Sequence, residues 1–294
     1  MDELYYLYAL TWADCPPGDF GPGLDARYAV ELAPCGRIAA LVSRVGTDKF
    51  DVSKFQSGTA DLAWVSKMAL RHNEIVQDLA RRTPVLPLRL AVLFRSKSSL
   101  LETLERCEAQ VVEFLRSLGD RQEWAVKVYL DRPQAERAIP GDCSANPLDA
   151  QRASGGAGTA YLAQRRQKLN RSQQLVRVIN QEVKAVEAGL QPLTDAWHRL
   201  RTLSPELTAR PEKMVWNGAF LVSKAAEAAF RDTAQRLRTD LGGKGLIVEA
   251  SGPWPPYHFC PALGQPESSP VACGSSTCDH EATAARDYPA GEVP

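Results

Sequence analysis

The sequence lacks an excess of charge of either sign. Its 294 residues include 35 lysines and arginines and 35 aspartates and glutamates. Proteins that bind the phosphate backbone of nucleic acids usually carry a basic surplus, so this balance disfavours a nucleic-acid partner. No run approaches the roughly 18 apolar residues of a membrane-spanning helix, and residues 1–6 carry acids where a secretory signal carries basic residues. We expect a cytoplasmic protein with no nucleic-acid or membrane partner.

Histidine is scarce, and catalytic motifs are absent. None of the four histidines lies four residues from another, so no helical histidine pair can bind a metal. Serine-elbow, metalloprotease, P-loop and kinase motifs are missing. Cys273, Cys278 and His280 lie close together in the sequence, but their spacing is unusual for zinc and a fourth ligand is missing. We expect no catalytic, cofactor-binding or metal-binding residues, and free thiols for the seven scattered cysteines.

The length and the patterns that are present predict two α+β domains. The first domain, residues 1–121, is expected to be an α+β sandwich. Its apolar run VLPLRLAVLF (85–94) predicts a strand buried on both faces, and Ser98 or Ser99 is expected to cap the helix that follows. The elements expected in this domain are a strand at 4–12, a hairpin at 27–45, a helix at 59–81, the strand at 85–94 and a helix ending at Gly119.

The second domain, residues 122–260, has the element order βαββαβ. This order is typical of the ferredoxin-like fold, an antiparallel sheet with two helices on one face. A flexible loop rich in Pro, Gly, Ala and Ser is expected at about 132–158, and residues 261–294 are expected to be a disordered tail. The predicted elements are strands at 123–130, 196–203, 213–223 and 245–251, and helices at 159–190 and 224–241.

The long helix at 159–190 carries apolar residues seven positions apart. These residues are Leu162, Leu169, Val176, Val183 and Leu190. The pattern is only a partial coiled-coil seam, so we favour a helix that lies on the sheet and keep a partner coiled coil as the alternative. The basic run at 165–171 is interpreted as a solvated helix face, with a docking patch for an acidic partner as the alternative.

The stretch SGPWPPYHF (251–259) follows the last strand and is rich in proline and aromatic residues. Its prolines have no backbone N–H, so the strand cannot continue past them. Trp254, Tyr257 and Phe259 can fold back as a clasp that closes the second domain. The alternative is an exposed aromatic edge that binds another protein.

Several stretches together resemble the gas vesicle protein F/L family (GvpF/GvpL). The resemblance covers residues 4–259, and its last piece is GPWPPYHF. The other matching pieces, in order, are LYYLYAL, HNEIV (72–76), VLPLRLAVLF, EWAVKVYL (123–130), GTAYLAQRR (158–166) and WNGAFLV (216–222). One departure is local: the family usually has Phe-Gly where this chain has Leu90–Ala91.

The resemblance implies a non-enzymatic accessory or minor structural protein of gas vesicle formation. Such a protein has two α+β domains and binds the small hydrophobic shell protein (GvpA-type) and other accessory proteins, in the cytoplasm and at the vesicle. We expect Trp254, Tyr257 and Phe259 to take part in this interaction, with the central run contributing as well. Its contributing residues are Pro87, Leu88 and Arg89. A charge inside an apolar run needs a counterion, so Arg89 is expected to pair with Glu74.

Two other classes of function remain open. The first is a ferredoxin-like regulatory protein that binds a small ligand, because such domains pair at their edges and bind metabolites there. The second is a hydrolase that uses His72 with Glu74. It ranks last, because no nucleophile is recognisable.

Overall fold

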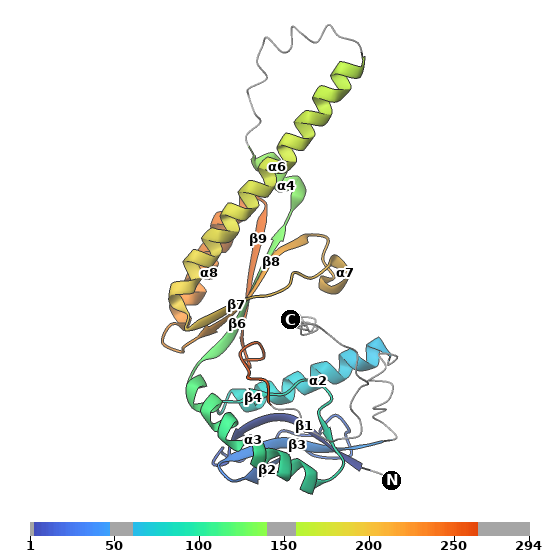
Figure 1. Cartoon of the computed structure of the whole chain (residues 1–294), viewed down its shortest axis with the longest axis vertical. Helices are drawn as coiled ribbons and strands as arrows, with labels where there is room; N and C mark the ends of the chain where they lie inside the picture. The colour runs from blue at the N-terminus through green and yellow to red at the C-terminus, as the bar shows by residue number, and fades with distance from the viewer. Residues whose placement is uncertain (1–2, 48–60, 140–156, 264–294) are drawn as a thin grey trace. The chain divides into compact units, whose positions relative to one another are not determined.

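The computed structural model describes residues 3–47, 61–139 and 157–263. They form two compact units (Figure 1). The first unit contains the chain up to Glu123 and the segment that begins at Pro253, and the second unit is Trp124–Gly252. Each unit has its own antiparallel sheet and its own helices, so the chain is a mixed α/β protein.

The sheet of the first unit is built on a long hairpin and the N-terminal strand. Its strand order is β2-β3-β1-β4, and β5 also pairs with β1. Gly36 lies in the hairpin turn with a φ of 58°, a backbone conformation that glycine adopts without strain. The strands are β1 (Glu3–Trp12), β2 (Glu31–Cys35), β3 (Ile38–Gly46), β4 (Leu86–Pro87) and β5 (Leu93–Phe94).

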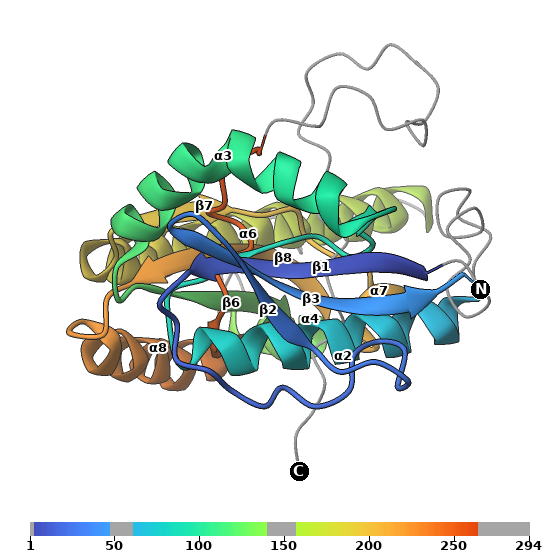
Figure 2. The same cartoon turned by 90° about the horizontal axis from the view of Figure 1, so that it is seen from below.

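Two helices cover opposite faces of this sheet. Figure 2 shows α3 (Lys97–Leu118) on one side of β1 and β3 and α2 (Leu62–Ala80) on the other. Both helices repeat apolar residues at three- and four-residue steps, so each buries one stripe against the sheet. Ile75, Val76 and Leu79 of α2 pack with Tyr6 and Tyr8. The stripe of α3 packs on the other face with residues such as Leu7 and Leu10.

A β-bulge in β1 places two successive residues on the same face. The pairing of β1 with β3 passes from Leu7↔Val42 to Ala9↔Leu41, so Tyr8 has no partner of its own. One extra residue in a strand breaks the alternation of its side chains. Tyr8 and Ala9 therefore both belong to the cluster under α2, while Leu7 and Leu10 face α3.

The prediction of one buried strand at 85–94 was wrong. The run contains two short strands, β4 and β5, separated by a turn at Leu90–Ala91. Ala91 has a φ of 69°, which no strand residue adopts, and Arg89 is exposed. The apolar composition suggested continuity, but the strand is interrupted by an excursion of the backbone. Both short strands pair antiparallel with β1, and residues 88–92 lie between the partners of Ala9 and Tyr6.

The second unit has the strand order β7-β8-β6-β9. Its main elements follow the predicted sequence of strand, helix, two strands, helix and strand. They are β6 (Gln122–Leu130), α6 (Ala157–Leu190), β7 (Ala196–Arg199), β8 (Lys213–Val222), α8 (Glu227–Gly242) and β9 (Leu246–Trp254). Three short elements are added: α4 (Arg132–Ala138), η1 (Gln191–Leu193) and α7 (Pro205–Thr208).

Part of the loop expected at 132–158 is helical. α4 begins at the first residues of that range, with the Asp131 side chain accepting from the amide of Gln134 and Pro133 in its first turn. Residues 140–156 lie outside the described residues, as does the tail from residue 264 onward.

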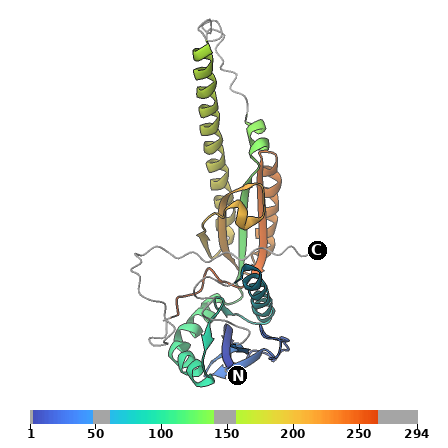
Figure 3. The same cartoon turned by 90° about the vertical axis from the view of Figure 1, so that its right-hand side faces the viewer.

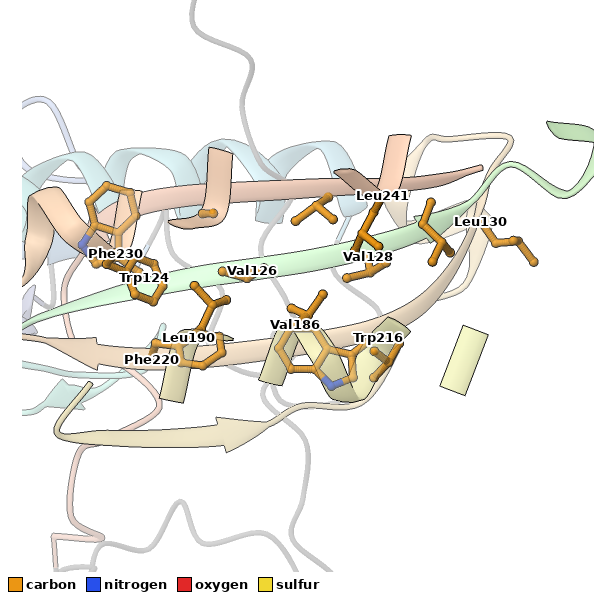
Figure 4. Packing of buried hydrophobic residues seen from close by; sticks show 14 of the residues in the cluster. Trp124, Val126, Val128, Leu130, Val186, Leu190, Trp216, Phe220, Phe230 and Leu241 are labelled. Carbon is orange, nitrogen blue, oxygen red and sulfur yellow. The ribbon is translucent and has the colours of Figure 1, made fainter. Parts of the chain in front are cut away.

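One face of the second sheet carries both long helices. Alternate residues of β6, namely Trp124, Val126, Val128 and Leu130, point into the same core (Figure 4). The C-terminal half of α6 contributes Val183, Val186 and Leu190 to this core, and α8 contributes Phe230, Ala234 and Leu241. This half of α6 lies on the sheet, as the sequence analysis favoured.

The N-terminal half of α6 extends beyond the strands of the second unit (Figure 3). Leu162, Leu169 and Val176 are 63%, 56% and 53% exposed, whereas Val183 and Leu190 of the same seven-residue series are buried. A single apolar stripe therefore begins in solvent and ends in a core.

Candidate interaction surface

Three segments of the first unit meet at the imidazole of His72, which is fully buried. The hydroxyl of Tyr6 lies 2.9 Å from Nδ1, and Nε2 lies 3.1 Å from the carbonyl oxygen of Leu88. A carbonyl oxygen only accepts, so Nε2 carries the proton and Nδ1 accepts from Tyr6. Burial lowers the pKa of His72 to about 4, so the ring is neutral at pH 7.

The hydroxyl of Tyr6 also binds the turn that follows Leu88. The amide of Ala91 donates to this oxygen at 3.0 Å. β1, α2 and the turn at 88–91 are thus joined by one chain of hydrogen bonds, from Ala91 through Tyr6 and His72 to Leu88. LYYLYAL, HNEIV and VLPLRLAVLF each contribute to this chain.

A second tyrosine of β1 anchors the long loop that precedes β2. The hydroxyl of Tyr8 lies 2.8 Å from Oγ of Ser43 and accepts from the amide of Leu24 at 3.0 Å. A Cβ atom at Gly23 would meet the Ser43 hydroxyl at 2.3 Å, so only glycine allows the loop to approach this closely.

The proline-rich C-terminal segment packs on the first unit. β9 continues through Pro253 to Trp254, which is possible because β9 is the edge strand of its sheet. The next two prolines are buried, and the amides of Tyr257 and Phe259 then donate to the carbonyl oxygens of Pro255 and Pro256. These turns direct the chain away from the strand.

Tyr257 packs in the cluster beneath α2, and Cys260 and Leu263 pack in the cluster beneath α3. The Cys260 sulfur lies 3.8 Å from the carbonyl oxygen of Pro87, and the side-chain amide of Gln110 donates to the carbonyl oxygen of Ala262 at 3.1 Å. The expectation that this segment closes a second domain ending at residue 260 is therefore corrected. The proline turns carry the apolar side chains to the first unit, where they are buried.

A buried carboxylate holds the same segment. Glu123 is only 3% exposed, and its two oxygens accept from the backbone amide of His258 at 2.9 Å and from Nδ1 of His258 at 2.6 Å. A buried carboxylate requires such donors. This pair was not predicted from the sequence. The available signal was an acid within an alternating apolar strand, beside a histidine in the aromatic segment.

All six predicted interaction residues lie in the first unit, in two adjoining stretches. Pro87 and Leu88 lie beside the segment that carries Trp254, Tyr257 and Phe259, because Cys260 contacts Pro87 and shares a cluster with Leu88. Pro87 is buried, and Leu88, Trp254, Tyr257 and Phe259 are half-buried. Arg89 is exposed beside them.

The predicted pair of Arg89 with Glu74 was wrong. Glu74 instead binds Arg71, three residues earlier on α2, at 3.0 Å. Since Arg89 is exposed at a turn, its charge is solvated and needs no buried counterion. The His72–Glu74 hydrolase hypothesis also loses its geometric basis, because the two side chains bind different partners.

The part of the chain that the structure describes contains no cluster of three His, Cys, Asp or Glu side chains suited to a metal ion. Cys273, Cys278 and His280 lie outside it. Cys15, Cys35, Cys107 and Cys260 are free thiols. Across residues 3–47, 61–139 and 157–263, no helix combines the length and apolarity that crossing a membrane requires.

Comparisons with known proteins give a consistent result. A family model described as "Gas vesicle synthesis protein GvpL/GvpF" matches residues 4–261. Gas vesicle protein L of Streptomyces sp. (strain CB03234) is 29% identical over 269 residues, covering 88% of this chain and 93% of that protein. Gas vesicle protein F of the same strain is 24% identical over 263 residues, covering 86% and 98%.

Two crystal structures share the fold. The gas vesicle protein GvpF from Anabaena sp. PCC7120 superposes with a TM-score of 0.64 at 18% identity, covering 89% of this chain and 99% of that one. GvpF from Microcystis aeruginosa gives a TM-score of 0.61 at 15% identity, covering 88% and 99%.

Proposed function

Since this chain belongs to the gas vesicle synthesis protein GvpL/GvpF family and has a role in gas vesicles, we propose that it binds the small hydrophobic shell protein. In this role it is an accessory or minor structural protein of vesicle formation, together with other accessory proteins. The observation that carries the proposal is the family match, which runs from residue 4 to residue 261 and so includes both units.

The surface proposed for this interaction is the one formed by Leu88, Arg89, Trp254 and Phe259 on the first unit. Three of these side chains are half-buried, so each keeps apolar area that a partner can cover. Arg89 adds an exposed charge at its border. Aromatic residues and arginine are the residue types that contribute most to binding at protein interfaces.

We also propose that the second unit is ferredoxin-like. The support is its element order, β6-α6-β7-β8-α8-β9, and its sheet order, β7-β8-β6-β9, with both long helices packed in one core against one face. In this plan the strands at the two edges are β7 and β9.

The test is binding of the full chain to the shell protein, produced together in one cell and recovered through a tag on this chain. We expect Trp254→Ala with Phe259→Ala to reduce the recovered shell protein roughly tenfold, the size of effect that one or two interface anchors produce. Arg89→Glu should reduce it less. Arg95→Glu, an exposed arginine of the same unit, is the matched control and should leave it unchanged.

Thermal unfolding of each variant separates lost binding from lost folding. Failure of the wild-type chain to retain any shell protein would refute the proposal. Deletion of the gene in a vesicle-forming cell should lower the number of vesicles, and unchanged numbers would contradict an accessory role. Probing purified vesicles for this chain distinguishes a component of the vesicle from a factor that acts only in assembly.

A further inference from the structure

The exposed half of α6 carries an apolar stripe that no other described part of the chain covers. Leu162, Leu169 and Val176 follow one another at intervals of seven residues, so they lie on nearly the same side of the helix. From the first to the last they span about 21 Å, at 1.5 Å per residue. Three large apolar side chains, each more than half exposed in one line, mark an interaction site.

This stripe leads into a groove on the second unit. Val176 is the last exposed residue of the stripe and also lines this groove. The groove has a volume of about 740 Å³ and lies where α6 meets the ends of β6 and β8. The lining of this groove is mainly apolar, and its four charged residues balance: two are acidic and two are basic. The apolar side chains include Leu130, Leu175, Ile179 and Val215, and the charged ones are Asp131, Arg132, Glu212 and Lys213. A partner helix that lies along α6 can therefore contact apolar side chains along its length and place its end in the groove. This shape suits a helix better than a flat surface.

The charges beside the stripe specify the partner. Between residues 157 and 181, α6 has five cationic residues and no carboxylate: Arg165, Arg166, Lys168, Arg171 and Arg177. All five are exposed, and only Arg171 has a described hydrogen bond, to the carbonyl oxygen of Glu136. Two copies of this helix would bring cations against cations in either orientation, which disfavours self-association.

We propose that the exposed half of α6, with the groove at Val176, is a docking site for an acidic amphipathic helix of another protein. The partner helix carries apolar residues at the same seven-residue spacing and carboxylates on both sides of them. This site is independent of the proposed shell-protein surface on the first unit. Basic residues beside an apolar seam select the partner by charge, and the seam supplies the affinity.

The first experiment measures binding of the full chain to a synthetic helical peptide of 24 residues with leucine at the seam and glutamate beside it. We expect micromolar binding that weakens at least tenfold between 50 mM and 500 mM salt, because screening removes the charge attraction. A peptide with lysine in place of glutamate, and one with alanine in place of leucine, should bind at least tenfold more weakly. Equal binding of all three peptides overturns the proposal.

Variants of the chain assign the site. Leu169→Ser with Val176→Ser should abolish binding of the acidic peptide without lowering stability, because both side chains are exposed. Leu207→Ser is the matched control, since Leu207 is 66% exposed on α7 of the same unit, and it should bind as the wild type does. Loss of binding in the control, or retention in the double variant, contradicts the assignment.

Other occupants have distinct outcomes, each of which overturns the proposal. A dimer in analytical ultracentrifugation that Leu169→Ser dissolves identifies a second copy. Flotation with phosphatidylserine vesicles, lost in the same variant, identifies a lipid surface. A chain that ends at Leu263 tests whether the chain's own C-terminal residues occupy the site, since residues 264–294 include five carboxylates and one arginine. If this truncation raises the affinity for the peptide tenfold, those residues are the occupant.

A photo-crosslinker at position 169 tests the partner in vesicle-forming cells. The crosslinked peptide should have a net negative charge and apolar residues spaced by seven. A basic or irregular crosslinked peptide contradicts the proposal.

Discussion

Among single residues, His72 connects α2 with two other segments of the first unit. Its ring accepts from Tyr6 of β1, donates to Leu88 and packs against the rings of Tyr6 and Tyr8, with centroid distances of 5.7 and 5.6 Å. A neutral imidazole suits this place because it supplies one donor and one acceptor. The residue therefore links β1, α2 and the turn at 88–91 through its hydrogen bonds.

The buried ring predicts a pH-dependent stability. In the unfolded chain a histidine has a pKa of about 6.5, and in the folded protein the pKa of His72 is about 4. Between these values the unfolded state binds a proton that the folded state does not. The free energy of unfolding should therefore fall as the pH is lowered from about 6.5 to 4, by up to about 3 kcal/mol from this residue, and be unaffected by it above that window.

Urea unfolding at several pH values checks this expectation. His72→Gln is the control, because its amide can still donate toward Leu88 but does not titrate, and its slope in this window should be smaller. Asp25 acts in a different pH window from His72. Its pKa is lowered to about 2, chiefly by its hydrogen bond to Arg27, so the stability that it contributes is lost only below about pH 4. Equal slopes for wild type and His72→Gln would refute the role of His72.

Ala91 adopts a backbone conformation that favours glycine. Its φ of 69° costs an alanine about 1 kcal/mol, because the Cβ atom approaches the following carbonyl oxygen. Ala91→Gly should raise the free energy of unfolding by up to about 1 kcal/mol, since glycine adopts this conformation freely. Ala109→Gly, at an exposed position in the middle of α3, should lower it by about the same amount. Urea unfolding of both variants provides the comparison, and the same sign at both positions contradicts the explanation.

At the scale of elements, α3 begins earlier than the sequence analysis expected. Ser96 is its N-cap, not Ser98 or Ser99: its Oγ accepts from the amide of Ser99 at 3.1 Å, and the Ser99 hydroxyl accepts from the amide of Ser96 at 3.3 Å. Serine at the third helical position thus supplies the contact usually made by glutamate. Because serines stand at 96, 98 and 99, the helix could begin after any of them. The observed N-cap gives the backbone amides of Ser96 and Ser99 each a hydroxyl acceptor.

Removal of this cap should destabilise the first unit. Ser96→Ala leaves the Ser99 amide without its acceptor and should lower the free energy of unfolding by about 1 kcal/mol. Ser98→Ala, which removes an exposed hydroxyl two residues later, should change it by less than about 0.5 kcal/mol. Denaturant midpoints of the two variants give the comparison, and equal losses would show that Ser96 is not the dominant cap.

At the scale of the whole molecule, the chain returns to its first unit after completing the second. The segment from Pro253 to Leu263 supplies Tyr257 and Cys260 to two apolar clusters and supplies His258 to the buried Glu123. Contacts between residues 123 and 258, or 87 and 260, close loops of more than 100 residues. The first unit is therefore complete only when nearly all of the chain has been made.

A truncation tests this dependence. A chain ending at Gly252 leaves the Glu123 carboxylate buried without His258 and uncovers apolar surface, so its first unit should lose several kcal/mol relative to a chain ending at Leu263. Hydrogen exchange followed by mass spectrometry should show faster exchange in peptides of β1 and α2, with peptides of β8 and α8 much less affected. Unchanged exchange in β1 and α2 would mean that the segment is dispensable for the first unit.

Local patterns in the sequence determined most of the elements. Alternation in β6, seven-residue spacing in α6 and the proline and glycine breaks predicted the order of strands and helices in the second unit, because periodicity and turn chemistry depend only on near neighbours. The family resemblance was confirmed for the same reason, since the motifs are short stretches in a set order. The six interaction residues were also selected in this way, and their role stays a prediction.

Only the tertiary structure decided where these elements pack. It divided the run 85–94 into two strands that pair with β1, carried Tyr257 and His258 to the first unit, paired Glu74 with Arg71 and left half of the α6 stripe exposed. Each of these outcomes depends on which surfaces far apart in the sequence meet and exclude water. An apolar or charged residue looks the same in a sequence whether or not such a surface reaches it.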